Sequence, residues 1–165
     1  MVKVIVASSV PNPALKQLET QFELLLFQTE GITYSSISHH PDVFICPFGE
    51  KWIVAPNLPQ PIKQALKTYD LDFVEGSIPI GMRYPESTHY NAVVTPKYFI
   101  HNLKHTDPKL LASHAVKTHI HVNQAYTRCN LLALRNDWFI TSDRGIEKTL
   151  LNHSLHVLYV NVGVA

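Results

Sequence analysis

The side chains best suited to chemistry stand in short polar segments beside apolar runs. His40 and Asp42 directly precede the apolar run 43–46, and Asn91 directly precedes the apolar run 92–95. An imidazole can carry a proton and a carboxylate can hold a cation, and the end of a strand is a rigid mount for both. We therefore predict that His40 and Asp42 are catalytic and that Asn91 binds a ligand. The alternative is that Asp42 only orders the entry to the strand, with His40 exposed.

A second polar segment, residues 83–86, contains a proline that marks it as a loop. Pro85 restricts Tyr84 before it to extended backbone geometry. Polar side chains of such a loop can line a pocket, so we predict that Glu86 is a catalytic carboxylate and that Tyr84 binds a ligand. A structural bend without function is the alternative.

Cys129 stands in a polar stretch, residues 123–130, that separates two apolar strands. We predict that Cys129 is a candidate nucleophile and that Gln124 contacts a ligand. A reactive thiol needs a lowered pKa, and the adjacent Arg128 is a weak cause for one, so the alternative is a small residue packed at the start of a strand. Asp143 is a further ligand-binding candidate, although a helix N-cap is the simpler interpretation.

The sequence predicts neither a metal site nor a cofactor. His119 and His121 lie on one face of a predicted strand, a spacing that a metal site can use, but no third ligand is identifiable. The sequence contains no phosphate-cradling glycine loop, no serine elbow and no CxxC pair. We therefore interpret the two histidines as exposed strand residues.

The polar segments recur because the chain repeats a β-β-α-β unit. Strands led by an aromatic residue begin at Trp52, Tyr98 and Trp138, and each follows an apolar run that we predict to be a strand. A helical stretch opened by proline or glycine follows each of them, and another apolar strand closes the unit. The N-terminal copy lacks its leading strand. The predicted units cover residues 1–28, 42–76, 91–123 and 130–162.

Repeats of this length are typical of propellers and arrays. Each β-α-β part must connect parallel strands by a right-handed crossover. We therefore predict one domain of the α/β class, residues 1–165, folded as a mixed-sheet propeller. A helix covers the outer side of each blade, and strand ends gather around a central axis. A three-layer α/β sandwich is the alternative.

The composition excludes several classes of function. The chain has 165 residues, of which 45% are hydrophobic, and a formal charge of +1. These values are typical of a globular protein and give no electrostatic reason to expect nucleic acid. The apolar runs are too short for a membrane span, and the N-terminus reads as a strand rather than a signal peptide. Two cysteines do not make a disulfide framework, so we expect a cytoplasmic protein.

Five ordered motifs carry a resemblance to a known family. They are HPDVF, WIVAPN, RYPES with YNAV, VNQAYTRCN and ITSDRGI. Together they resemble an uncharacterised bacterial family of the pentein fold, also called the guanidino-group-modifying enzyme fold. The resemblance covers nearly the whole chain and implies a five-bladed α/β propeller, of which about four blades are represented here.

The same resemblance implies chemistry at a guanidino carbon. In such chemistry a thiolate attacks, a histidine moves protons and carboxylates hold the planar cation. The candidates for these carboxylates are Asp42, Glu86 and Asp143. Members of the family usually continue into a glycine-rich last blade, and nothing like it follows NVGVA. Enzymes of the wider fold place their nucleophilic cysteine in that blade, at a position that neither Cys46 nor Cys129 matches.

We therefore expect a pentein-fold protein that binds a small guanidino or amide compound at the axis, and we leave catalysis open. As an enzyme it would be a hydrolase or transferase acting on guanidino or other C–N bonds. The alternative is a non-catalytic protein-interaction module, like the ribosome anti-association factors of this fold. Because an incomplete ring leaves strand edges uncovered, we also expect a homo-oligomer or a complementing C-terminal segment. We expect neither a nucleic acid nor a membrane as partner.

Overall fold

The computed structural model describes residues 1–135 and 137–161, and it contains the four repeat units in the predicted order. The first unit consists of β1 (Val2–Ala7), α1 (Asn12–Glu19) and β2 (Phe22–Phe27). The second consists of β3 (Ile45–Phe48), β4 (Lys51–Val54), α3 (Gln60–Thr68) and β5 (Phe73–Glu75). The third consists of β6 (Val93–Val94), β7 (Tyr98–His101), α4 (Pro108–Ser113) and β8 (Thr118–His121). The fourth consists of β9 (Leu131–Ala133), β10 (Trp138–Thr141), α6 (Arg144–Asn152) and β11 (His156–Tyr159).

Strand pairing repeats from unit to unit. In each of the last three units an antiparallel hairpin is followed by a parallel pair that the helix connects, as in β3–β4 and β4–β5. The pairs β6–β7–β8 and β9–β10–β11 follow the same pattern, and β1–β2 is parallel without a leading strand. The α/β class and the β-β-α-β unit are therefore confirmed. The end of the fourth predicted unit, at residue 162, and Asn136 before β10 lie outside the described residues.

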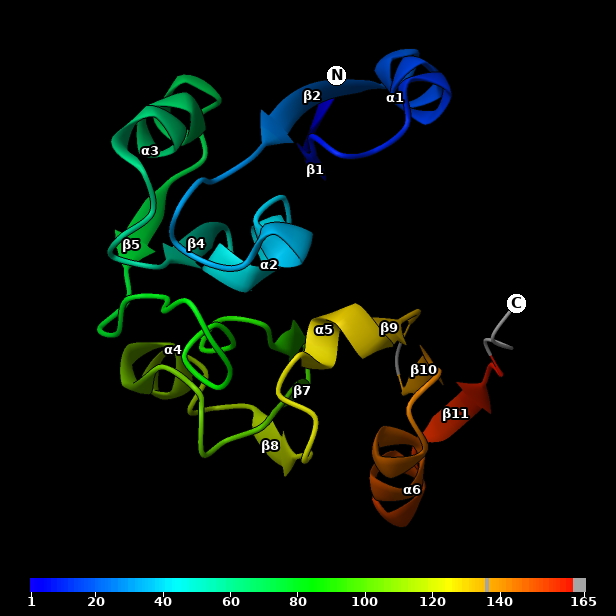
Figure 1. Ribbon diagram of the computed structural model, residues 1–165. Coiled ribbons are helices and arrows are strands. Elements are labelled where there is room, and N and C mark those ends of the chain that lie inside the picture. The colour runs from blue at the N-terminus through cyan, green and yellow to red at the C-terminus, as the bar shows by residue number, and fades with distance from the viewer. Residues whose placement is uncertain (136, 162–165) are drawn as a thin grey trace.

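The four units form four separate small sheets rather than one continuous sheet. Figure 1 shows the sheets following one another around an arc, with α1, α3, α4 and α6 toward its outer side. Two short helices, α2 (Pro41–Phe44) and α5 (Thr127–Asn130), lie toward the middle of the arc, and β1 and β11 belong to its two end units. No closed ring of sheets is formed by the described residues. None of the helices described is long and apolar enough to cross a membrane.

Two of the outer helices begin at aspartate N-caps, Asp107 and Asp143. The side chain of Asp107 accepts a hydrogen bond of 3.0 Å from the backbone N–H of Leu110 in α4. Asp143 accepts one of 2.9 Å from the N–H of Ile146 in α6. Each carboxylate satisfies a backbone donor that a helix leaves free in its first turn. The N-cap interpretation of Asp143 is therefore confirmed.

The core forms two apolar clusters that meet at the third unit. Phe99 of β7 packs in a cluster with Phe27 and Phe44, while its neighbour Ile100 packs with Phe139 of the fourth unit. Successive side chains of a strand point to opposite faces, so β7 can support the core on both sides. All four residues of β7 are buried accordingly.

The leading strand of the second unit starts later than the sequence predicts. Val43 and Phe44, expected in a strand, belong to the single helical turn α2, and β3 begins at Ile45. Both side chains are fully buried. A short apolar run is equally compatible with a buried helical turn, and Pro41 favours the first turn of a helix. The helical turn carries Asp42, one of the predicted site residues.

A buried histidine of β7 makes the fold sensitive to acid. His101 is completely buried. Its Nδ1 lies 2.7 Å from Thr106 Oγ1, and its Nε2 lies 2.9 Å from the carbonyl oxygen of Ala125. Burial lowers the pKa of His101 from 6.5 to about 4. The unfolded chain therefore binds a proton that the folded chain excludes between these two values.

We expect this contribution to stability to be complete above pH 6.5 and to disappear as the pH falls toward 4. The free energy of unfolding should drop by about 3 kcal/mol over that range, since each unit of pKa difference corresponds to about 1.4 kcal/mol. Urea unfolding at several pH values measures the drop. His101→Gln should show a shallower pH dependence than the wild type. The exposed His153→Gln should keep the full drop, and equal slopes for both variants would contradict the assignment.

Candidate functional site

Three of the predicted site residues meet because each precedes the first strand of a different unit. Asp42 lies in α2 before β3, Asn91 lies directly before the β6 region, and Cys129 lies in α5 before β9. The short helices α2 and α5 lie toward the middle of the arc (Figure 1). The repeat therefore delivers side chains from three units to one place. We call Asp42, Asn91 and Cys129, together with His40, the central cluster.

Asn91 holds the central cluster together. Its Nδ2 donates a hydrogen bond of 2.9 Å to Asp42 Oδ2, and its Oδ1 accepts one of 2.8 Å from the backbone N–H of Arg128. The Cys129 thiol donates to the same Asp42 Oδ2 at 3.2 Å. Asn91 is completely buried, whereas Asp42 is partly exposed. A buried amide thus fixes the position of a carboxylate that solvent and ligands can reach.

His40 completes the central cluster on the other side of the carboxylate. Its Nδ1 lies 3.6 Å from Asp42 Oδ1, and 42% of its side chain is exposed to solvent. The imidazole therefore lies beside Asp42 and is open to solvent. The prediction that His40 and Asp42 act at one place agrees with this geometry, and their catalytic role stays a prediction.

The thiol of Cys129 is not activated in this arrangement. Burial of the sulfur and the neighbouring Asp42 carboxylate raise the pKa of Cys129 to about 12, even though the residue as a whole reaches solvent. A nucleophilic cysteine needs the opposite shift, because the thiolate is the reactive form. Cys46 is no substitute, since complete burial raises its pKa to about 12 as well.

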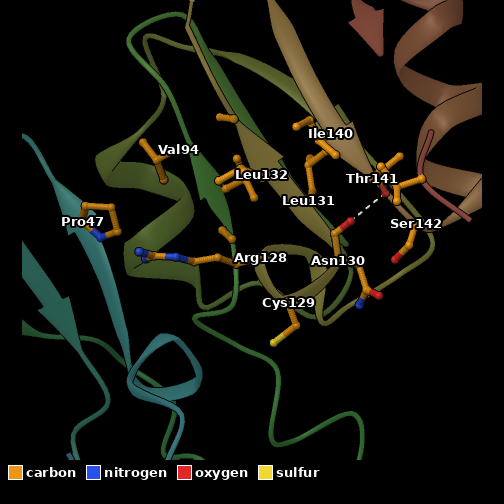
Figure 2. Close-up of a pocket in the computed structure, with 14 residues that line it drawn as sticks. Pro47, Val94, Arg128, Cys129, Asn130, Leu131, Leu132, Ile140, Thr141 and Ser142 are labelled. Carbon is orange, nitrogen blue, oxygen red and sulfur yellow. Dashed lines mark hydrogen bonds between the residues drawn. The ribbon is translucent and has the colours of Figure 1, made fainter. Parts of the chain in front are cut away.

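Two cavities adjoin the central cluster. One, of about 500 Å³, lies between β6 and the hairpin β9–β10, and Cys129 and Arg128 line it (Figure 2). Figure 2 shows Arg128 extended toward Pro47, and the sulfur of Cys129 turned away from the apolar wall. The other cavity, of about 210 Å³, is lined by Asp42, Arg128 and Lys3. The hydrogen bond between Cys129 and Asp42 therefore links the two cavities.

A chain of hydroxyl groups stands beside α5. Tyr126 Oη lies 2.7 Å from Tyr34 Oη and 2.5 Å from Ser87 Oγ, and burial raises the pKa of Tyr126. Sequence reasoning missed these residues and the cavity-lining role of Arg128. Tyr126 and Arg128 do belong to the polar stretch 123–130, which was the available signal, but Tyr34 and Ser87 have no such signal.

The other predicted site residues serve local structure or stand outside the central cluster. Glu86 is exposed, and its backbone oxygen accepts a hydrogen bond of 3.1 Å from the N–H of Gly81. Tyr84 is exposed and packs edge-on against the ring of His105. Gln124 Oε1 accepts from the backbone N–H of Tyr126 at 3.1 Å. These residues share the sequence signature of the cluster members, but the described contacts do not bring them to Asp42.

The two strand histidines of β8 bind backbone groups. His119 Nε2 lies 2.9 Å from the carbonyl oxygen of His114, and His121 Nδ1 accepts a hydrogen bond of 3.1 Å from the N–H of Leu103. Each ring therefore has a structural partner of its own. This pairing agrees with the interpretation that the His119–His121 spacing is not a metal site.

Comparison with known proteins places the chain in a family. No curated protein matches it. The model of a family of unknown function, DUF6873, matches residues 5–164. Because this match spans nearly the whole sequence, the chain belongs to that family.

Proposed function

We propose that this protein binds a small polar compound with a guanidino or amide group at the central cluster. We further propose that its four units are blades of a pentein-type propeller. The observation that carries the proposal is the Asp42 carboxylate, which a buried Asn91 orients from a different unit at 2.9 Å. Clustered polar groups beside open cavities favour ligand binding over a filled, purely structural centre.

A planar cation fits the chemistry of Asp42. A guanidinium group presents parallel N–H donors that match the two oxygens of a carboxylate, and such charge-assisted pairs are stronger than neutral hydrogen bonds. Asp42 Oδ1 faces His40, so one oxygen is not occupied by Asn91 or Cys129. Arg128 lines both cavities and provides positive charge for an anionic group at the far end of a ligand. Free arginine is a ligand with both groups: a guanidinium for Asp42 and an anionic carboxylate for Arg128.

We expect arginine to bind and Asp42→Asn to weaken its binding by about tenfold or more, because the variant loses a charge-assisted hydrogen bond worth about 1.5–3 kcal/mol. Isothermal titration calorimetry in the presence of a metal chelator measures the change. Citrulline, which replaces the cation by a neutral urea group, tests the need for charge. Glu19→Gln, an exposed carboxyl change at the end of α1, is the control and should bind like the wild type.

Two outcomes would contradict the proposed function. One is the absence of saturable binding of arginine to the folded chain, and the other is equal affinity in the wild type and Asp42→Asn. We expect no turnover of arginine, because the raised pKa keeps Cys129 in the unreactive thiol form. Hydrolysis that disappears in Cys129→Ser would make Cys129 the nucleophile after all.

A second candidate function is a non-catalytic protein-interaction module. Large apolar side chains are exposed on the fourth sheet, at Leu132, Trp138 and Leu158, and on the first sheet at Val2 and Leu26. Exposed apolar side chains on uncovered sheets favour partners such as a second copy or a complementing strand segment. Association of the chain that is lost in Leu132→Ser and unaffected by Asp42→Asn would favour this alternative.

A further inference from the structure

The central cluster contains three different side chains that are metal ligands elsewhere in proteins. A ring nitrogen of His40, a carboxylate oxygen of Asp42 and Cys129 Sγ all lie within 4.8 Å of one another. They come from two elements far apart in the sequence, the start of α2 and the helix α5. Imidazole, carboxylate and thiolate are the three ligand types that zinc accepts.

The distances agree with those around a single tetrahedral ion. With metal–ligand bonds of about 2.0–2.3 Å, the ligand atoms of a tetrahedral zinc site lie about 3.4–3.6 Å apart. Cys129 Sγ lies 3.2 Å from Asp42 Oδ2, and His40 Nδ1 lies 3.6 Å from the other oxygen, Asp42 Oδ1. The carboxylate thus lies between the two other ligands, and a rotation of its side chain would bring one oxygen to a shared ion. The third pair, His40 and Cys129, is within 4.8 Å, and a rotation of the partly exposed imidazole can shorten it.

We propose that His40, Asp42 and Cys129 bind one zinc ion, with a solvent molecule as the fourth ligand. Binding replaces the thiol proton of Cys129, which leaves to solvent, so that the sulfur coordinates as thiolate. This proposal rests on the geometry of the cluster and does not depend on the proposed ligand. Because zinc and a guanidinium group both need the Asp42 carboxylate, one excludes the other.

Asn91 gives the site its outer support. It donates to Asp42 Oδ2 at 2.9 Å, and its Oδ1 lies 3.4 Å from the backbone nitrogen of Cys129, which donates to it. One completely buried side chain thus fixes both elements that carry the ligands. Hydrogen bonds of this kind orient ligating carboxylates in zinc sites and sustain their affinity. A thiolate with an imidazole disfavours calcium and magnesium, which prefer oxygen ligands.

Cobalt is the probe for the experiment, because it takes the tetrahedral geometry of zinc and gives a thiolate-to-metal absorption band in the ultraviolet. We expect the chelator-treated protein to bind one equivalent of Co²⁺ with this band, and zinc to displace it. Cys129→Ser should abolish the band. His40→Ala should keep the sulfur ligand and weaken binding by at least about tenfold, because the loss of a direct ligand should cost no less than the loss of an outer supporting group, about 10–100-fold. The neighbouring His39→Ala and the buried Cys46→Ala are matched controls and should bind cobalt like the wild type.

Thiol alkylation gives a second test that needs no variant. Cys129 is exposed and Cys46 is buried, so iodoacetamide should modify Cys129 first. We expect one equivalent of zinc to slow that modification at least about tenfold, because a coordinated sulfur is shielded and bound. No cobalt band in the folded chain, a band that persists in Cys129→Ser, or alkylation that zinc leaves unchanged would each overturn the metal site. Arginine binding is measured with chelator present, so its failure and the failure of the metal site are separate results.

Discussion

Asp107→Ala is expected to lower the free energy of unfolding by about 4 kcal/mol, the largest stability loss that we expect from one polar side chain. The carboxylate of Asp107 is completely buried and accepts four hydrogen bonds. Their donors are the N–H groups of Ser77 at 2.7 Å, Ile78 at 2.8 Å and Leu110 at 3.0 Å, and Tyr90 Oη at 3.1 Å. Removing the acceptor leaves the N–H groups of Ser77, Ile78 and Leu110 without this partner, which is costly where they are shielded from water, whereas Tyr90 Oη can still donate to the carbonyl oxygen of Ile78 at 2.6 Å.

Urea unfolding of the wild type and the variant measures this loss. Asp143→Ala is the matched control, since Asp143 is also an aspartate N-cap but is only half-buried. Its removal should cost about 1 kcal/mol, the usual value for a lost cap. The two losses of unfolding free energy should differ because Asp107, unlike Asp143, also connects α4 to the segment after β5. Similar costs for both variants would show that the buried network around Asp107 contributes little.

Asn91→Ala is expected to remove ligand binding together with part of the stability. The variant loses the hydrogen bonds of 2.9 Å to Asp42 Oδ2 and of 2.8 Å from the N–H of Arg128. The side chain that connects Asp42 in α2 to Arg128 in α5 is then missing. We expect the free energy of unfolding to fall by about 2–3 kcal/mol, because a completely buried side chain and its two hydrogen bonds are removed. Arginine affinity should fall by about tenfold or more, because Asp42 is no longer held in place.

Asn57→Ala separates these two effects. Asn57 also makes a pair of hydrogen bonds with the backbone, to the oxygen and from the N–H of Ile80 at 2.8 and 2.9 Å, but it has no contact with the central cluster among the described residues. It should lose stability and keep the wild-type affinity for arginine. An Asn91→Ala variant that unfolds more easily but still binds arginine normally would show that Asn91 is structural only.

The repeat could be predicted from the sequence because its signals are local. Aromatic-led strands, helices that begin at proline and aspartate caps follow from short-range propensity, and the observed strands β4, β7 and β10 begin at or beside the predicted aromatic residues. The prediction that the second unit starts with a strand at residue 43 was wrong, because the short apolar run 43–46 has no periodicity that distinguishes a strand from a helix. Tertiary packing of Phe44 decides in favour of the helical turn.

The site was only partly predictable, because its contacts join distant parts of the chain. Asp42 meets Asn91 across 49 positions and Cys129 across 87, and these meetings depend on how the units are arranged in space. The polar segments beside strands included these three residues, which the structure brings together, and their function stays a prediction. The same signal also selected Asp143, which the structure uses as a helix cap. The sequence already indicated the N-cap role of Asp143, but which polar residues meet across distant segments depends on the arrangement of the units.

Nuclear magnetic resonance titration with arginine tests the central claim most directly. In chelator-treated protein, we expect saturable shifts of the Asn91 side-chain amide and of the backbone amides of Asp42, Arg128 and Cys129. These groups surround the proposed ligand position, and the same shifts should be absent in Asp42→Asn. Saturable shifts confined to the exposed sheet of β9–β11, or no shifts at any arginine concentration, would contradict the assignment of the central cluster as a ligand site.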